Sequence, residues 1–287
     1  MQVRKYFFYL IKNKIMKLNQ FTYFSNLVVL IIICSFSFSL FCDAAVNYQL
    51  SIQDPATNSL EWMANFYDLI MADLALVLCV IFFLITILLT DPIHHKHSNS
   101  SFSHSQNLEI FWTIVPALIL LGIAYPSFNL LYSLDDLTDP VLTLKIVGHQ
   151  WYWSYEFLDL DFQAREFDAY MVPTDDLLLG EFRLLTTDNQ LSLPKRIPIK
   201  LLITSADVLH SWSVPSFGVK VDACPGRLNE ASLYVKRSGL YFGQCSEICG
   251  VNHGFMPIMV KVNSMEGWVS KCLPESVPRS KLFFRSK

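Results

Sequence analysis

Residues 243–257 read Gly-Gln-Cys-Ser-Glu-Ile-Cys-Gly-Val-Asn-His-Gly-Phe-Met-Pro, and this stretch decides how the rest of the chain is interpreted. It brings together two thiols, Cys245 and Cys249, the imidazole of His253 and the thioether of Met256. A second imidazole, His210, precedes them in Val-Leu-His-Ser-Trp at 208–212. Soft sulfur ligands mixed with imidazole are the set that copper prefers over hard cations. We therefore predict a metal site built from these residues.

The glycines and the proline of the stretch argue against a helix there. An ideal helix would place positions 245, 249, 253 and 256 on one face. However, glycine and proline destabilise helix interiors. The flanks, 239–242 and 255–262, are rich in aromatic and β-branched residues, which is typical of strands. We expect the ligands on a loop between two strands.

Three other interpretations of the same residues stay open at this point. Two Cys and two His could hold a tetrahedral zinc ion. A mononuclear blue copper site uses a single Cys with two His and a weak axial Met. A Cys245–Cys249 disulfide is compatible with a compartment outside the cytosol, but it leaves His210, His253 and Met256 without a role. Two thiolates, two imidazoles and a thioether suit two copper ions bridged by both sulfurs.

The composition indicates a membrane protein. Hydrophobic residues make up 52% of the 287 residues and charged residues 16%, against about 25% charged in an average soluble domain. Residues 1–43 contain basic positions, then the apolar run 27–34, and are followed by Ala44 and Ala45. That order is typical of a cleaved leader; the alternative is a retained signal anchor. The net charge is −3, and no nucleic-acid partner is expected.

Two long apolar segments predict membrane-spanning helices at about 68–90 and 110–132, since about 20 apolar residues cross a bilayer. Together they form a hairpin over 44–133. The loop between them is rich in His, but a loop of this kind is more often simply solvated, and we assign it no site. Glu109 stands directly before the second span, where a negative charge is favourable at a helix N-terminus.

From residue 141 onward the long apolar runs give way to short alternating segments. We expect strands at 141–147, 182–185, 197–203, 231–235 and 258–262, separated by turn signals such as those at 173–176, 188–189 and 238–239. Many short strands with such turns predict a β-sandwich or barrel. This domain spans 134–270, and 271–287 form a polar, basic tail.

An aromatic and an acidic feature stand out within that domain. If 148–156 is a strand, Trp151, Trp153 and Tyr155 face one way, and most of these rings serve the core or an interface belt. Twelve acids fall within 135–188: Asp135, Asp136, Asp139, Glu156, Asp159, Asp161, Glu166, Asp168, Asp175, Asp176, Glu181 and Asp188. Such a run usually forms a solvated acidic face. It can also steer a basic partner.

The two motifs, at 207–215 and 245–257, resemble subunit II of cytochrome c oxidase, and the resemblance extends over about 43–270. It implies a membrane-anchored α+β fold, in which a two-helix transmembrane hairpin precedes a cupredoxin-like Greek-key β-barrel. It also implies a dinuclear copper A centre held by His210, Cys245, the backbone carbonyl of Glu247, Cys249, His253 and Met256.

The resemblance implies the following roles. Electrons from reduced cytochrome c arrive through Trp151 and pass from copper A to haem in the catalytic subunit I, supporting oxygen reduction coupled to proton pumping. Glu109 marks the entrance of a proton path, and the Glu247 carboxylate shares a Mg²⁺ ion with the catalytic subunit. The expected location is the mitochondrial inner membrane, with the copper domain in the intermembrane space. We expect the docking surface to include Glu156, Asp159, Asp161, Asp168, Asp188 and Asp207.

Other classes of protein make different demands on this sequence. A copper carrier or assembly protein needs exposed, exchangeable thiols but neither the acidic face nor Trp151. A soluble nitrous oxide reductase has the ligand pattern without a helical hairpin. A quinol oxidase subunit has the hairpin without Cys245 and Cys249.

Overall fold

The computed structural model describes residues 43–90, 104–134, 139–159 and 166–272. The expected leader up to residue 42, the loop 91–103, Asp161 and the tail after residue 272 lie outside the described residues. Our expectations for these parts stay predictions.

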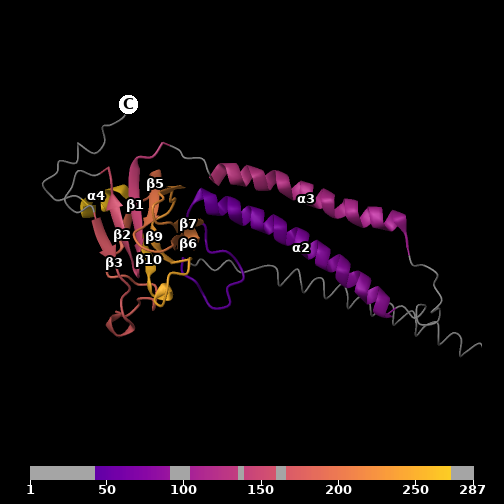
Figure 1. The fold of residues 1–287 in the computed structure, drawn as a ribbon, viewed down its shortest axis with the longest axis horizontal. Helices are drawn as coiled ribbons and strands as arrows, with labels where there is room; N and C mark the ends of the chain where they lie inside the picture. Colours follow the sequence, from indigo (N-terminus) through magenta and orange to yellow (C-terminus); the bar gives the residue numbers. More distant parts are fainter. Residues whose placement is uncertain (1–42, 91–103, 135–138, 160–165, 273–287) are drawn as a thin grey trace, which may run out of the picture. The chain divides into compact units, whose positions relative to one another are not determined.

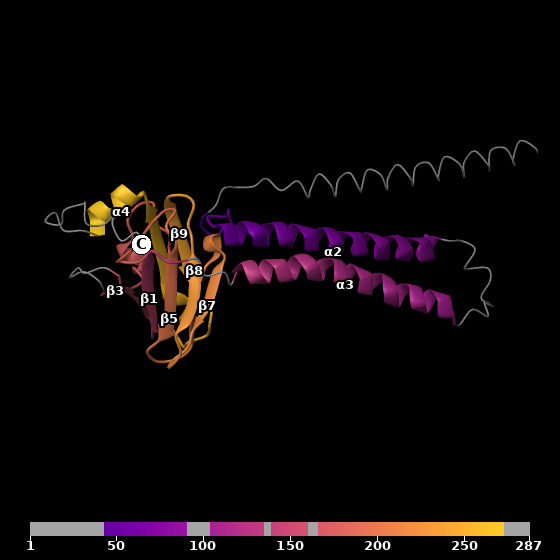
Figure 2. The ribbon, with the colours of Figure 1, turned by 90° about the horizontal axis from the view of Figure 1, so that it is seen from above.

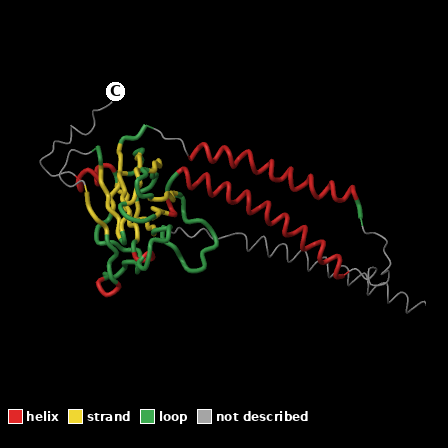
Figure 3. The backbone as a smooth tube through the Cα atoms, viewed as in Figure 1, coloured by secondary structure: helices red, strands yellow, loops and turns green. Residues whose placement is uncertain are grey.

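Two long helices come first along the chain, α2 (Asn58–Thr90) and α3 (Gln106–Leu134), and Figure 3 colours both red. They contain the two expected spans, and α2 begins well before residue 68. Both are long and apolar enough to cross a membrane. Their large apolar side chains, such as Leu78 and Leu121, are exposed to the surroundings, which is how a lipid-facing helix presents itself. Pro116 and Pro126 lie inside α3 without ending it.

The strands follow the second helix (Figure 1). They are β1 (Leu142–His149), β2 (Tyr152–Phe157), β3 (Glu166–Ala169), β4 (Leu191–Pro194), β5 (Ile199–Ser205), β6 (His210–Val214), β7 (Val219–Ala223), β8 (Asn229–Leu233), β9 (Gly239–Gln244) and β10 (Pro257–Asn263). Short 3-10 turns occur at η1 (Thr174–Asp176), η2 (Pro215–Phe217) and η3 (His253–Phe255), and helix α4 spans Met265–Cys272.

The strands form a five-stranded sheet, a three-stranded sheet and a two-stranded ribbon. The five-stranded sheet has the order β3-β2-β1-β5-β8, and β1, β5 and β8 can be followed in Figure 2. The smaller sheet has the order β4-β10-β9, and the ribbon pairs β6 with β7. β1 is parallel to β5 and β4 is parallel to β10, so the chain crosses between the sheets. Such crossings are typical of Greek-key sandwiches and barrels.

The core lies between these sheets, and β1 and β5 bury alternate residues toward it. In β1 the buried side chains are Leu142, Leu144 and Ile146, as expected for a strand with one face inward. β6 differs, since all five of its residues are buried. It lies against β9, where the backbone N–H of Ser246, just beyond β9, donates to the carbonyl of Ser211 at 3.1 Å.

One expected strand, 182–185, is absent, and its residues form a turn. The carbonyl of Phe182 accepts backbone hydrogen bonds from Leu185 and Thr186, and Leu184 adopts a positive φ of 64°. The Phe182 ring packs edge-on against Phe242. The apolar run thus reflects packing of a turn rather than a strand.

Candidate metal centre

The metal-binding candidates come from three segments that meet at one end of β6 and β9. His210 is the first residue of β6, and its side chain is fully buried. Cys245 and Cys249 lie in the loop after β9, as expected, and no helix forms there. His253 begins η3, and Met256 directly precedes β10.

One group of donors surrounds Cys245. Its Sγ lies 3.9 Å from Nδ1 of His210 and 3.3 Å from the backbone carbonyl of Glu247. Gly148 leaves room for the ring of His210, because a Cβ at this position would lie only 2.8 Å from Cδ2 of that ring.

A second group surrounds Cys249. Its Sγ lies 3.6 Å from Nδ1 of His253 and 3.5 Å from Sδ of Met256. The two groups meet at the thiols, whose Sγ atoms are 4.0 Å apart. His210 thus lies beside Cys245, and His253 lies beside Cys249 and also interacts with Cys245.

This arrangement discriminates among the interpretations of the sequence. Cys245 and Cys249 are free thiols, and 4.0 Å is about twice the length of a disulfide bond. A tetrahedral zinc site would use four donors. Two donor groups joined by two sulfurs fit two soft metal ions that share both thiolates. The His210, Cys245 and Cys249 donor atoms alone lie within 4.8 Å of one another.

Asp207 contacts the ring nitrogen of His210 that faces away from Cys245. Its Oδ1 lies 2.8 Å from Nε2 of His210, and its Oδ2 accepts the backbone N–H of Gln150 at 2.7 Å. Burial favours the neutral imidazole, but hydrogen bonds to Cys245 and Asp207 outweigh it and raise the pKa of His210. Burial likewise opposes ionisation of Asp207, and the bond to His210 lowers its pKa. From the sequence Asp207 was predicted only as part of the docking surface; its spacing of three residues from His210 is the signal that could have indicated this contact.

The two thiols differ in acidity in the metal-free protein. Burial raises the pKa of Cys245, but hydrogen bonds, first of all with His210, outweigh burial and lower it to about 7. Burial and the negative charge of Cys245 raise the pKa of Cys249 to about 12. One thiolate thus forms readily, whereas the second needs a cation to displace its proton.

Trp151 contacts the ligand loop directly. Its indole Nε1 donates to the carbonyl oxygen of Cys249 at 3.2 Å, and the side-chain amide of Gln150 donates to the same oxygen at 2.9 Å. Gly250 permits this approach, because it has a φ of +120° and a Cβ there would lie 3.0 Å from the indole. Trp153, by contrast, is fully buried and donates to the carbonyl of Met256.

An open depression of about 660 Å³ lies over Trp151. Its lining is mostly aromatic and amide: Gln150, Trp151, Tyr152, Tyr170, Met171, Asn252 and Phe255. Beside it the rings of His149, Tyr152 and Tyr170 form a stack with centroid separations of 4.5 and 4.4 Å. Two members of the stack, Tyr152 and Tyr170, line the depression.

Several acids of the expected docking surface have partners within the domain. Glu156 pairs across the strands with Lys145 at 2.9 Å. Asp159 accepts the backbone N–H of Thr143, and Asp168 accepts the hydroxyl of Ser154 at 2.6 Å. Asp188 accepts the backbone N–H of Tyr170 at 2.8 Å. These bonds fix the positions of the carboxylates near the edge of the five-stranded sheet.

The two remaining site candidates lie apart from each other in the chain. Glu109 is in the first turn of α3, where its carboxylate pairs with Nδ1 of His104 at 2.9 Å. Glu247 lies between Cys245 and Cys249 in the chain and is half-buried. Its backbone carbonyl contacts the Cys245 thiol, as described above.

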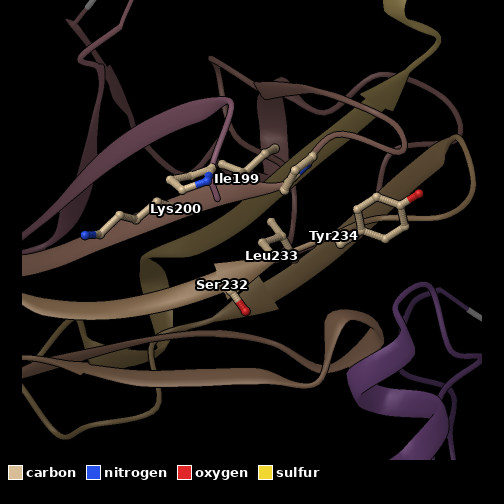
Figure 4. A pocket seen from close by; sticks show the side chains of 7 residues that line it. Ile199, Lys200, Ser232, Leu233 and Tyr234 are labelled. Carbon is tan, nitrogen blue, oxygen red and sulfur yellow. The ribbon is translucent and has the colours of Figure 1, made fainter. Parts of the chain in front are cut away.

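A small, partly open pocket of about 90 Å³ lies elsewhere on the domain, beside β5 and β8. Ile199, Lys200, Ser232, Leu233 and Tyr234 surround it in Figure 4. The Lys200 ammonium pairs with Glu230 at 2.8 Å. This lining offers no grouping of thiols, imidazoles or carboxylates, so the pocket does not compete with the centre at Cys245 and Cys249.

The fold and the site define a class: a membrane-anchored β-domain that carries a buried metal centre of thiolates, imidazoles and a thioether. Family models match two parts of the chain. Residues 45–130 match the transmembrane domain of cytochrome c oxidase subunit II, and residues 142–263 match its periplasmic domain. The chain belongs to the cytochrome c oxidase subunit II family. It is therefore a subunit of a haem–copper oxidoreductase, and the family implies a copper A centre that the donor set fits.

Individual relatives agree with the family models. Cytochrome c oxidase subunit 2 of Phytophthora megasperma is 48% identical over 234 residues, covering 80% of this chain and 88% of the relative. The Chondrus crispus protein of the same name is 48% identical over 236 residues, covering 79% and 91%. The solved periplasmic domain of subunit II from Bradyrhizobium japonicum is 41% identical, covers 47% of this chain and 94% of that one, and gives a TM-score of 0.43. The two long helices, the strand topology and the family models together confirm the predicted fold class, a helical hairpin followed by a cupredoxin-like β-domain.

Proposed function

We propose that this chain accepts electrons from reduced cytochrome c at a dinuclear copper A centre and passes them to haem in the catalytic subunit I. This transfer would support the reduction of oxygen to water coupled to proton pumping. The observation that carries the proposal is the pair of donor groups described above, one on Cys245 and one on Cys249, joined by sulfurs 4.0 Å apart.

His210, Cys245, the Glu247 carbonyl, Cys249, His253 and Met256 would hold the metal. When bound, a dinuclear copper centre would store and release one electron. The protein holds these donors in a nearly dry setting, since Cys245 is 7% and Cys249 4% exposed. A rigid, buried donor set favours retention of the metal, which argues against a carrier that must exchange it.

Trp151 is the residue we propose for electron uptake. Its indole lines the open depression and is bonded to the carbonyl of Cys249. It thus connects a surface that a partner can reach with the backbone of a metal ligand. Gln150 makes the same two contacts, but only Trp151 makes them with an aromatic ring.

A partner with a basic face fits the surroundings of Trp151. The carboxylates of Asp168 and Asp188 lie on or next to the strands that border the depression; Glu156 is on β2, and Asp159 lies two residues after that strand. A negative surface raises the association rate of a basic partner by roughly ten- to a thousand-fold at low salt. Cytochrome c is the partner that the family implies.

The remaining roles extend this proposal to the rest of the enzyme. Glu109 would mark the entrance of a proton path, and the Glu247 carboxylate, a hard ligand, would suit a Mg²⁺ ion shared with the catalytic subunit. We place the chain in the mitochondrial inner membrane with the copper domain in the intermembrane space. The proposed limits are 1–43 for a leader, 44–133 for the hairpin, 134–270 for the copper domain and 271–287 for the tail.

Metal analysis combined with electron paramagnetic resonance on the full-length chain in detergent tests the proposal. We expect two copper ions per chain and a mixed-valence signal that is lost in Cys249→Ser. Cys224→Ser is the matched control, because Cys224 is a free, half-buried thiol outside the donor set. A single zinc ion, a mononuclear copper signal, or an unchanged signal in Cys249→Ser would refute the donor assignment. Rapid loss of copper to a chelator would favour the carrier.

A further inference from the structure

The first turn of α2 is hydrogen-bonded to the β-domain through a set of residues that we name the joint. On one side it contains residues 53–61, and on the other 215–218 and 235–237. The N–H of Ala56 donates to the carbonyl of Ser216 at 2.9 Å, and the N–H of Lys236 donates to the carbonyl of Ala56 at 2.8 Å. Thr57 forms an isolated antiparallel bridge with Val235. Residues 53–61 thus join the edge of the β-domain by backbone pairing.

Thr57 links the helix to the domain with a single hydroxyl. Its Oγ1 accepts the N–H of Leu60 at 3.1 Å and donates to the carbonyl of Phe217 at 2.7 Å. The first bond is an N-cap of α2, and the second fastens that cap to η2. Leu60 is buried, and Gly218, with a φ of +67°, lies so close that a Cβ there would be 3.0 Å from the Cβ of Leu60.

Arg237 gathers the segment that precedes the helix. Its guanidinium donates to the carbonyl of Asp54 at 3.1 Å and to that of Pro55 at 3.5 Å. It also lies over the ring of Tyr241, 5.2 Å from the centroid. The guanidinium therefore limits the freedom of the chain at the point where α2 begins.

The two β-domain segments of the joint, 215–218 and 235–237, are each adjacent to a strand whose other end lies at a metal-ligand candidate. Residues 215–217 follow β6, which begins with His210. Arg237 precedes β9, and β9 ends next to Cys245. β6 and β9 are in close contact, because a Cβ on Gly243 would lie 2.0 Å from the carbonyl oxygen of Ser213. Two strands of five and six residues therefore connect the joint with the donor set.

We propose that the joint is a positioning device that fixes the distance between the copper centre and the start of the membrane helix α2. The inference rests on the proposed function. The step concerned is transfer of one electron, in which the copper pair is oxidised and the haem iron of the catalytic subunit is reduced. Because electron transfer slows steeply with distance, a joint of fixed geometry keeps this transfer uniform. Thr57, Arg237 and the backbone of 215–218 are positioning residues for it.

The test compares Arg237→Met and Thr57→Ala in the assembled oxidase. Arg237→Lys and Thr57→Ser are the conservative partners, and Lys200→Met, which removes an ion pair on β5, is the matched control. The first readout is amide hydrogen exchange at Ala56 and Lys236. We expect it to accelerate about 5- to 30-fold in Arg237→Met and Thr57→Ala, the effect of losing one or two hydrogen bonds. Thr57→Ser and Lys200→Met should exchange like the unaltered chain.

The second readout separates electron uptake by copper from reduction of haem after rapid mixing. In both loosened variants we expect unchanged uptake from cytochrome c and an unchanged copper spectrum, with haem reduction several-fold slower and spread over several rates. Thr57→Ser should restore a single rate.

The proposal is wrong if amide exchange accelerates while haem reduction keeps its rate. It is also wrong if electron uptake by copper slows as much as haem reduction does. If Arg237→Met does not assemble, Thr57→Ala and Thr57→Ser decide the question. Absence of copper from the unaltered chain would remove the proposed function, and exchange would still report on the joint.

Discussion

The indole N–H of Trp151 donates a hydrogen bond to the carbonyl oxygen of Cys249, with a distance of 3.2 Å between the heavy atoms. A surface aromatic ring is thereby joined to the backbone of a residue whose sulfur belongs to the donor set. The contact depends on Gly250, because a side chain there would occupy the position of the indole. Trp151 thus connects the open depression with the donor set, whereas Trp153 lies in the core and has no contact with that surface.

Replacing Trp151 should therefore slow electron uptake without removing the metal. In Trp151→Ala we expect uptake from cytochrome c to fall by at least about tenfold, which corresponds to about 1.4 kcal/mol in the barrier. The uptake rate of Trp151→Phe should lie between those of the unaltered chain and Trp151→Ala, since phenylalanine keeps a ring but loses the N–H. Stopped-flow absorbance measures the rate, and the copper content measures retention. Tyr234→Leu, at an exposed aromatic outside the depression, is the control; equal rates in all variants would contradict the role.

Docking near Trp151 should weaken as salt is added. Raising the ionic strength from 0.01 to 0.15 M shortens the Debye length from about 30 to about 8 Å, so the association rate should fall by about tenfold or more. Asp168→Asn should make this dependence shallower, whereas Glu230→Gln, which lies on β8 and pairs with Lys200, should not. Association rates measured across the salt series decide the matter. A rate indifferent to salt would exclude electrostatic steering.

The donor set was predictable from the sequence because ligand chemistry and spacing are local properties. Cys245, Cys249, His253 and Met256 lie in one loop, and glycines with flanking β-branched residues indicate a loop between strands. The strands at 141–147 and 258–262 were also predictable, since each alternates in polarity. The segment 182–185 was not, because an apolar run does not distinguish a strand from a turn packed on Phe242.

Contacts between distant parts of the chain could not be predicted in this way. Arg237 and Asp43 are 194 positions apart, and nothing in either neighbourhood indicates that they pair. The charge of Asp207 was counted as part of an acidic face, although its geometry makes it a partner of His210. A run of acids in the sequence predicts a charged surface. Only the fold shows which of these carboxylates is hydrogen-bonded to a metal-ligating side chain.

Asp207 should tune the affinity for copper. Partners of this kind, which orient a metal-ligating imidazole, typically change metal affinity by about 10- to 100-fold when removed, and we expect a loss in that range for Asp207→Asn. The amide would also place a donor opposite the N–H of Gln150. Competition with a chelator of known affinity measures the change, with Asp222→Asn, an exposed acid on β7, as control. An unaltered affinity would show that Asp207 does not position His210.

Gly148 should report on the packing of His210. A methyl group at this position would lie 2.8 Å from Cδ2 of the imidazole, so Gly148→Ala should displace the ring and cost about 1–3 kcal/mol of stability through overpacking. We expect an altered copper spectrum together with a lower free energy of unfolding. Gly254→Ala in the ligand loop is a close control, since its added methyl group meets nothing within 4 Å. Similar spectra for both variants would argue against this tight contact.

The two thiols of the metal-free protein should react at different pH. The thiolate is the nucleophile, and the pKa of about 7 for Cys245 makes that residue largely ionised at pH 8, whereas the pKa of about 12 keeps Cys249 protonated. Iodoacetamide should therefore modify Cys245 first, with a rate that rises through pH 7 and levels off above pH 8. Peptide mass spectrometry assigns each site. Because the charge of Cys245 raises the pKa of Cys249, Cys245→Ser should make Cys249 react faster at pH 9. Equal reactivity of the two thiols across this range would mean that His210 does not stabilise the thiolate of Cys245.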